Sequence, residues 1–158
     1  MGMIRFEFQL ADPSPSKAQL FVEQLRHKAL DLPFREVGEI IDVSGDDFNR
    51  LDPDDPNGVL LIQCVQYVQR ARTHYWLTPT RVIAFHTFPD DGPQQVCFGL
   101  AAYPRAPGID LGTWYWSSIC NPQTVIVNLL DSAADLGILK EVREEEGLPD
   151  DWFDEVVS

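Results

Sequence analysis

The sequence has few residues of the types that bind metal ions or form disulfide bonds. Cysteine and histidine each occur three times in 158 residues: Cys64, Cys97, Cys120, His27, His74 and His86. No CxxC or HExxH spacing is present, so the sequence gives a zinc site no support. An odd number of isolated cysteines fits reduced thiols in a cytoplasm better than a disulfide framework. We therefore expect no metal, no cofactor and a cytoplasmic location.

Basic residues are also scarce, because 12 lysines and arginines stand against 25 acidic residues and the formal net charge is -13. Nucleic acid and anionic membrane surfaces both require a basic face, so neither is an expected partner. The chain has no apolar run near the ~18–20 residues of a membrane-spanning helix, and its first residues, MGMIRFEF, show no secretory signal. The acidity indicates solubility or, alternatively, a basic partner or a cation.

The acidic segment at residues 44–58 is the natural place to look for such a cation. It contains five aspartates, but Pro53 and Pro56 interrupt the alternating oxygens that a calcium loop needs. No glutamate closes the loop six residues after Gly58, where Cys64 stands. We therefore interpret this segment as a solvated turn.

Apolar residues are plentiful, at 44% of the chain, and the length predicts one globular domain over residues 1–158. Alternating apolar and polar residues at positions 4–10 predict a strand with one face in water. Ser14 and Pro15 are typical of a helix start and predict a helix over residues 15–30. Residues 34–43 then predict a second strand with a weak point or bulge at its glycine.

The segment at residues 112–147 predicts a β-α-β unit around which the chain is organised. Aromatic and β-branched residues favour a strand at 113–119. An amphipathic pattern predicts a helix over residues 122–136, and an extended segment at 138–143 follows.

The boundaries of this second helix rest on specific residues. Asn121 is a suitable N-cap, Pro122 suits the first helical position, and Gly137 can adopt the left-handed conformation that ends a helix. The helical period places Leu129 and Leu130 on the buried side, with Asn128 and Asp135 exposed.

The strands at residues 81–88 and 95–103 predict a hairpin, in which a symmetric register places His86 opposite Cys97. One face then carries Ile83, Phe85, Val96, Phe98 and Leu100. The other face carries Ala84, His86, Cys97, Gly99, Ala101 and Tyr103. Two helices cover only the first face, so the second must be shielded by residues 104–112, by a helix at residues 150–157, by a second subunit or by a ligand.

Two tryptophans, Trp114 and Trp116, alternate on the next strand and suggest a site. If they adjoin the second hairpin face, they form an apolar trough whose polar groups are His86, Cys97 and Tyr103. Ligand pockets commonly have this character, mostly apolar with a few polar groups. We predict these five residues as ligand-binding, with a small apolar molecule or a protein partner, possibly a second copy, as the ligand. The alternative is that the tryptophans and the histidine belong to the core.

A catalytic alternative depends on Cys120, which precedes a helix N-terminus. The helix dipole at such a position lowers the pKa of a thiol. A cysteine hydrolase could therefore be assembled from Cys120, His86 and Glu145, although no sequence feature places the three together. A buried, inert cysteine is the other interpretation.

The second half of the chain resembles a family of small bacterial proteins without a settled function. The resemblance rests on ordered segments: RVIAFHTFPDDG, FGLAAYP, WYWSSICNPQ, VIVNLLDSAADLGI and VREEEG, followed by Trp152. It implies a bacterial, cytoplasmic, single-domain protein. In that family a cysteine like Cys120 precedes Lys-Thr-Gln and a loop that contains histidine. This chain has Asn121-Pro122-Gln123 there, so any chemistry of that loop is absent.

Together these patterns predict an α+β domain. A mixed, largely antiparallel sheet is expected, with both main helices packed on one face and a C-terminal β-α-β unit. The function predicted first is a non-catalytic binding or interaction module that uses the aromatic sheet face. The alternatives are a small enzyme with a Cys120 and His86 site, and an obligate homo-oligomer built through the same face.

Overall fold

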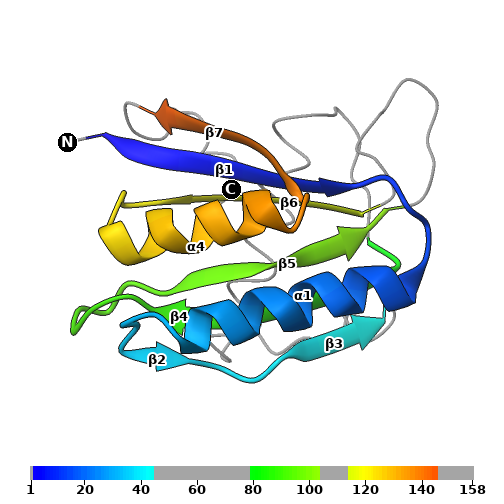
Figure 1. Cartoon of the computed structure of the whole chain (residues 1–158), viewed down its shortest axis with the longest axis horizontal. Helices are drawn as coiled ribbons and strands as arrows, with labels where there is room; N and C mark the ends of the chain where they lie inside the picture. Colours follow the sequence, from blue (N-terminus) through cyan, green and yellow to red (C-terminus); the bar gives the residue numbers. More distant parts are fainter. Residues whose placement is uncertain (1, 45–78, 104–113, 146–158) are drawn as a thin grey trace, which may run out of the picture.

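The computed structural model describes residues 2–44, 79–103 and 114–145 of the chain (Figure 1). In chain order the elements are β1 (Met3–Leu10), α1 (Pro15–Leu30), β2 (Glu36–Val37), β3 (Ile41–Ser44), β4 (Arg81–Phe88), β5 (Val96–Ala102), β6 (Trp114–Cys120), α4 (Thr124–Asp135) and β7 (Leu139–Glu145). The predicted acidic turn at 44–58 and the helix at 150–157 lie outside the described residues, apart from Ser44. Residues 59–69, for which the sequence leaves strand and helix open, also lie outside them.

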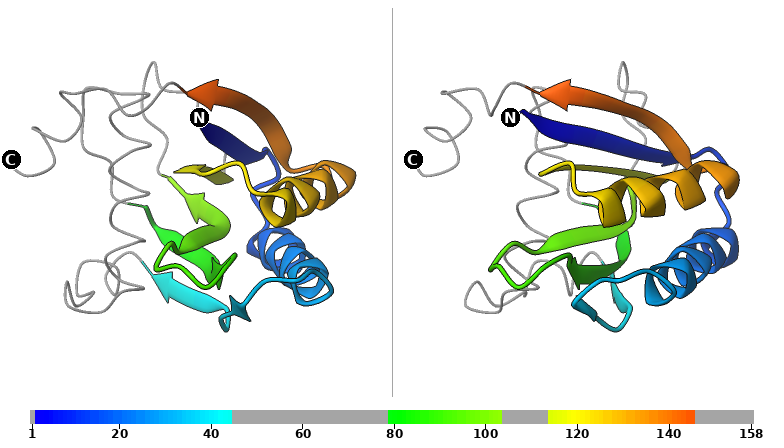
Figure 2. Two further views of the ribbon diagram at one scale, coloured as in Figure 1. Left: turned by 90° about the vertical axis from the view of Figure 1, so that its left-hand side faces the viewer. Right: turned by 60° about the vertical axis from the view of Figure 1, so that its left-hand side comes forward.

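The described strands form a seven-stranded sheet in the order β2-β4-β5-β6-β1-β7, with β3 also paired to β4. Every pairing of neighbouring strands is antiparallel. Because β6 and β7 are both antiparallel to β1, they run parallel to each other with β1 between them, and α4 connects them. Both helices lie on the same side of the sheet (Figure 2). The predicted α+β class and the C-terminal β-α-β unit are confirmed.

Helix α1 begins at Pro15 after Ser14 and ends at Leu30, which agrees with the helix predicted over residues 15–30. Proline suits this first position because an N–H there has no partner inside the helix. The buried stripe recurs at the spacing of one helix face: Ala18, Val22, Leu25 and Ala29. This stripe orients α1 against β4 and β5.

Helix α4 begins later than its sequence signals suggest, because Gln123 rather than Asn121 occupies the N-cap position. The side chains before the helix bond to the β4–β5 turn instead: Asn121 donates to Gln94, and Gln123 donates to Asp90 and Gln94. The prediction that Asn121 caps this helix is therefore wrong.

The C-terminus of α4 agrees with the prediction, since Gly137 adopts a φ of 82°. The N–H of Ile138 donates to the carbonyl of Ala133, and that of Gly137 donates to the carbonyl of Ala134. These two bonds form a Schellman motif, which needs a left-handed residue where a Cβ is unfavourable. The motif ends the helix and turns the chain into β7.

Leu130 lies on the buried side of α4 with Leu129, while Asn128 and Asp135 are exposed, as the helical period predicts. Replacing Leu130 by alanine is expected to lower the free energy of unfolding by about 2–5 kcal/mol, because it leaves a cavity in the core. Urea denaturation measures the change. Val127→Ala, at an exposed position of the same helix, is the matched control, and an equal loss in both variants would contradict the assignment of the buried face.

The strand predicted at residues 34–43 is split by a bulge at Gly38. Val37 lies opposite Thr87 and Ile41 lies opposite Ala84, so three residues of this segment face two residues of β4. Arg26 of α1 holds the bulge in place by donating from Nε to the carbonyl of Gly38 at 2.8 Å. The bulge therefore joins the edge of the sheet to the helix layer.

The two faces of the β4–β5 hairpin are those expected from a symmetric loop, with His86 opposite Cys97. The helix-side face contains the aromatic core, in which Phe98 stacks on Phe6 at 5.3 Å between ring centroids and contacts Phe85 at 5.9 Å. On the far face Ala84, Cys97 and Ala101 are buried as well. The segments predicted to shield this face, 104–112 and 150–157, lie outside the described residues.

Strand β1 corrects one prediction, because its polar face is not in water. Arg5 is 4% exposed and Glu7 is 1% exposed. Arg5 Nη2 lies 2.9 Å from Glu7 Oε1, and Arg5 Nε donates to Ser117 Oγ at 3.2 Å. Alternation reports the polarity of a strand face, not its burial, and two opposite charges can be buried when they neutralise each other.

Candidate functional site

The predicted aromatic trough is not formed, because the strand registers separate its members. Trp114 lies opposite Leu10, and Trp116 lies opposite Phe8, which places both indoles on the helix-side face of the sheet. His86 lies opposite Cys97 on the far face. The hypothesis that the tryptophans and His86 line one surface is therefore wrong. Because neighbouring side chains alternate between faces, a single step in the β5–β6 register decides this outcome.

Both tryptophans are part of the core. Their side chains are among the largest that are almost fully buried. The indole N–H of Trp116 donates to the backbone carbonyl of Cys97 at 3.1 Å. This hydrogen bond ties β6 to β5 and gives the buried polar edge of the indole a partner, as aromatic N–H groups usually require.

His86 and Cys97 lie opposite each other on the far face, as predicted. The imidazole lies against Gly38, where an added Cβ would stand 2.3 Å from Cε1 of the ring. The Nδ1 atom of His86 is buried and has no hydrogen-bond partner. The ring thus occupies the space that any side chain at Gly38 would need, which explains the glycine at this position. Tyr103, just after β5, is also buried.

The alternative site built on Cys120 is not assembled. Cys120 lies opposite Ile4 on the helix-side face and is fully buried, whereas His86 lies on the far face of β4, with β5 between their strands. Burial raises the pKa of the Cys120 thiol to about 12, the opposite of the lowering expected beside a helix N-terminus. Desolvation disfavours the thiolate more than the helix end stabilises it, so this cysteine stays protonated at neutral pH.

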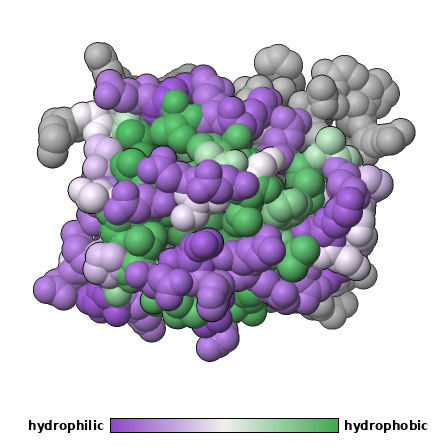
Figure 3. All heavy atoms as spheres, viewed as in Figure 1, coloured by the Kyte–Doolittle hydropathy of each residue, from purple (hydrophilic) through white to green (hydrophobic). Residues whose placement is uncertain are grey.

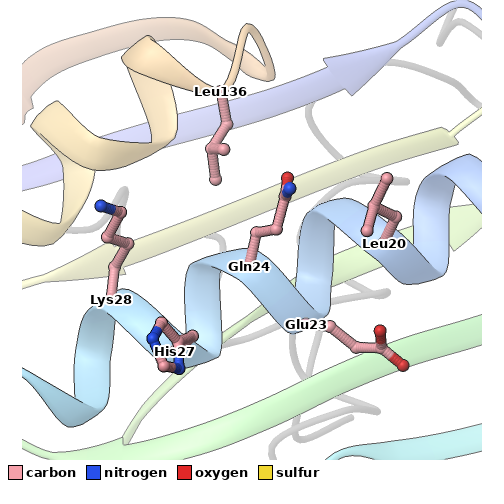
Figure 4. Close-up of a pocket in the computed structure, with 6 residues that line it drawn as sticks. All are labelled: Leu20, Glu23, Gln24, His27, Lys28 and Leu136. Carbon is pink, nitrogen blue, oxygen red and sulfur yellow. The ribbon is translucent and has the colours of Figure 1, made fainter.

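A groove lies on the outer side of the helix layer, between α1 and the end of α4. Its volume is about 380 Å³, and its lining consists of Leu20, Glu23, Gln24, His27, Lys28 and Leu136. Figure 4 shows Leu20, Gln24 and Lys28 projecting from α1 toward the side of Leu136. These three residues are spaced by four, so they form one stripe of the helix. Apolar surface is visible between the polar ridges of the helix layer (Figure 3).

Sequence reasoning missed this groove because it considered only the buried stripe of the first helix. The available signal was Leu20, an apolar residue outside that stripe, which is 49% exposed. A single apolar residue on the solvent-exposed side of an amphipathic helix is common and does not by itself indicate a site. Only the position of Leu136, which α4 brings from a distant part of the chain, turns it into one wall of a groove.

Comparison with known proteins finds no match: no family description, no curated protein and no solved structure corresponds to this chain. The resemblance of the second half to a bacterial family stays a prediction. No helix among residues 2–44, 79–103 and 114–145 is long and apolar enough to cross a membrane. Within the same residues, no three histidine, cysteine or acidic side chains gather where they could hold a metal ion. The class that the structure defines is an α+β domain with an antiparallel sheet and a one-sided helix layer.

Proposed function

We propose that the protein is a non-catalytic binding module whose α1–α4 groove binds a small amphipathic carboxylate. The single observation behind this proposal is the groove itself, whose lining combines Leu20 and Leu136 with the ammonium of Lys28 and the amide of Gln24. Glu23 and His27 also line the groove, but Figure 4 shows both side chains pointing away from Leu136. Its volume of about 380 Å³ is in the range of small-molecule sites, which are mostly apolar with a few placed polar groups. The sequence had suggested a small apolar ligand on the sheet, and the groove offers a different place for one.

The chemistry of the ligand follows from the lining. Leu20 and Leu136 offer apolar contacts to a hydrocarbon chain or ring. Lys28 and Gln24 project on the same side of α1 and supply N–H donors, which suit a carboxylate at the end of that chain. The raised pKa of Cys120 and its separation from His86 favour binding over the catalytic alternative.

Titration with decanoate, an alkyl chain that ends in a carboxylate, tests this proposal. Calorimetry should detect saturable binding, and amide chemical shifts should change at Leu20, Gln24, Lys28 and Leu136. Leu20→Asp should abolish binding, because it removes apolar contact and adds a negative charge to the groove. Lys28→Gln should weaken decanoate binding roughly twofold to fivefold, since an exposed charge pair contributes about 0.2–1 kcal/mol, and should leave binding of uncharged decanol unchanged.

Leu30→Asp is the matched control, because Leu30 is on the same helix and is 52% exposed but does not line the groove. This variant should bind decanoate as the unmodified protein does. The proposal fails if decanoate does not bind up to its solubility limit, or if Leu20→Asp and Leu30→Asp reduce binding equally.

A further inference from the structure

Strand β7 ends the described sheet and pairs there with β1 alone. Its side chains from Lys140 to Glu144 are exposed, including an apolar one, Val142, which is 43% exposed. An edge strand presents backbone N–H and C=O groups that can pair with a further strand. The surface in question is therefore the outer edge of β7.

The charges beside Val142 have opposite signs on its two sides. Glu141 precedes it and Arg143 follows it, so the two charges cancel although the whole chain carries -13. Lys140 is not part of this pattern, because the register of β7 against β1 shifts at this residue and its ammonium lies 5.9 Å from the centre of the Tyr115 ring. An antiparallel second copy of β7, related by a two-fold axis through Val142, would place each Glu141 opposite an Arg143 of the other copy.

Other registers of the same pairing are less favourable. An axis through Arg143 would oppose two arginines, and an axis through Glu141 would oppose two glutamates. Like charges directly opposite each other on neighbouring strands are destabilising. A shift that moves side chains to the other face breaks the continuity of the sheet faces. Of these axes, only the one through Val142 places unlike charges opposite each other, whereas the ladder with β1 places like charges there.

The contacts of β7 with β1 add to this argument. Across that ladder Glu141 lies opposite Glu7, and Arg143 lies opposite Arg5, so like charges face each other. Within β7, Arg143 Nη1 lies 3.9 Å from Glu141 Oε1. A second β7 would bring charges of the opposite sign to the outer side of the same two residues.

We propose that a second copy of this chain pairs antiparallel across β7, with the two-fold axis through Val142, so that one sheet runs through both subunits. This surface differs from the aromatic face considered from the sequence and from the α1–α4 groove. A charged edge strand ordinarily discourages pairing. Here the charges are self-complementary, and they exclude partners that lack the same order while accepting an identical strand.

The charge order can be tested by swapping it. Sedimentation equilibrium of the full chain should detect a monomer–dimer equilibrium. Glu141→Arg and Arg143→Glu should each weaken dimerisation about tenfold, because each replaces two opposite-charge pairs by two like-charge pairs. The double variant Glu141→Arg/Arg143→Glu should recover the original association constant, since it is again self-complementary. Leu20→Asp should leave association unchanged, so this proposal and the groove proposal fail independently.

The position of the axis has its own readout. Val142→Cys should be cross-linked between subunits by a short bismaleimide, because directly opposite residues have Cβ atoms about 4.5–5.5 Å apart, which is beyond the usual range of a direct disulfide. Glu144→Cys should not, and the unmodified protein controls for its own cysteines. A monomer at every concentration up to the solubility limit, a double variant that stays weakened, or equal cross-linking at both positions would each overturn the proposal.

Discussion

Replacing Glu7 by leucine is expected to lower the free energy of unfolding by about 3–5 kcal/mol, the usual cost of breaking a buried ion pair from one side. The loss comes from Arg5, a guanidinium that is 4% exposed and would no longer have this carboxylate at 2.9 Å. Its bond to the uncharged hydroxyl of Ser117 at 3.2 Å remains. The converse variant, Arg5→Met, should cost a similar amount, because it removes the guanidinium that lies 2.9 Å from the buried Glu7 carboxylate.

The double variant Arg5→Met/Glu7→Leu separates charge from packing. Replacing a whole buried pair by apolar residues of similar volume is often neutral or stabilising, so the double variant should recover most of the lost free energy. Urea denaturation at neutral pH measures all three variants. Arg81→Met is the surface control, since Arg81 pairs with Asp42 in partial exposure and such pairs contribute about 0–1 kcal/mol. A double variant as unstable as the single ones would contradict this account.

The second large effect is expected for Trp116→Ala, which should lower the free energy of unfolding by about 3–5 kcal/mol. The substitution empties the space of a nearly fully buried indole and leaves the carbonyl of Cys97 without its 3.1 Å donor. Trp116→Phe keeps most of the aromatic volume and loses one hydrogen bond, so it should cost about 0.5–1.5 kcal/mol.

Chemical denaturation and decanoate titration of the Trp116 variants should be measured together. We expect the loss to appear in stability alone, with decanoate affinity unchanged in the folded protein, because Trp116 faces the core rather than the groove. Unchanged stability combined with lost binding would contradict this account and would support the role in ligand binding that the sequence suggested for the tryptophans.

Local signals in the sequence were sufficient for most of the described elements. Pro15 starts a helix and Gly137 ends one, because each depends on the conformation of its own backbone. Gly38 marks the bulge between β2 and β3 for a different reason, since the ring of His86 fills the space that a side chain would need there. The hairpin register, with His86 opposite Cys97, follows from a short loop that is symmetric about its centre. Burial of Leu130 follows from the helical period alone.

The site could not be predicted in the same way, because it depends on how separate elements meet. The trough required Trp114 and Trp116 to share a face with His86, but β6 pairs with β5 so that Ala101 lies opposite Tyr115. Residues 104–113 connect these strands, and a connection of that length does not transmit the register as a tight turn does. The tryptophans therefore face the helices. The α1–α4 groove could not be predicted from the residue pattern of either helix alone, because it needs residues from both.

By itself the sequence determined where the chain turns, which segments are helical or extended, and which side of each helix is apolar, since these properties act over a few neighbouring residues. Only the tertiary structure decided which strand faces are buried together. It put Arg5 and Glu7 inside, moved the pKa of Cys120 upward rather than downward, and set Leu136 beside Leu20. Burial and strand register are properties of the whole sheet, so a residue's own neighbours in the chain cannot specify them.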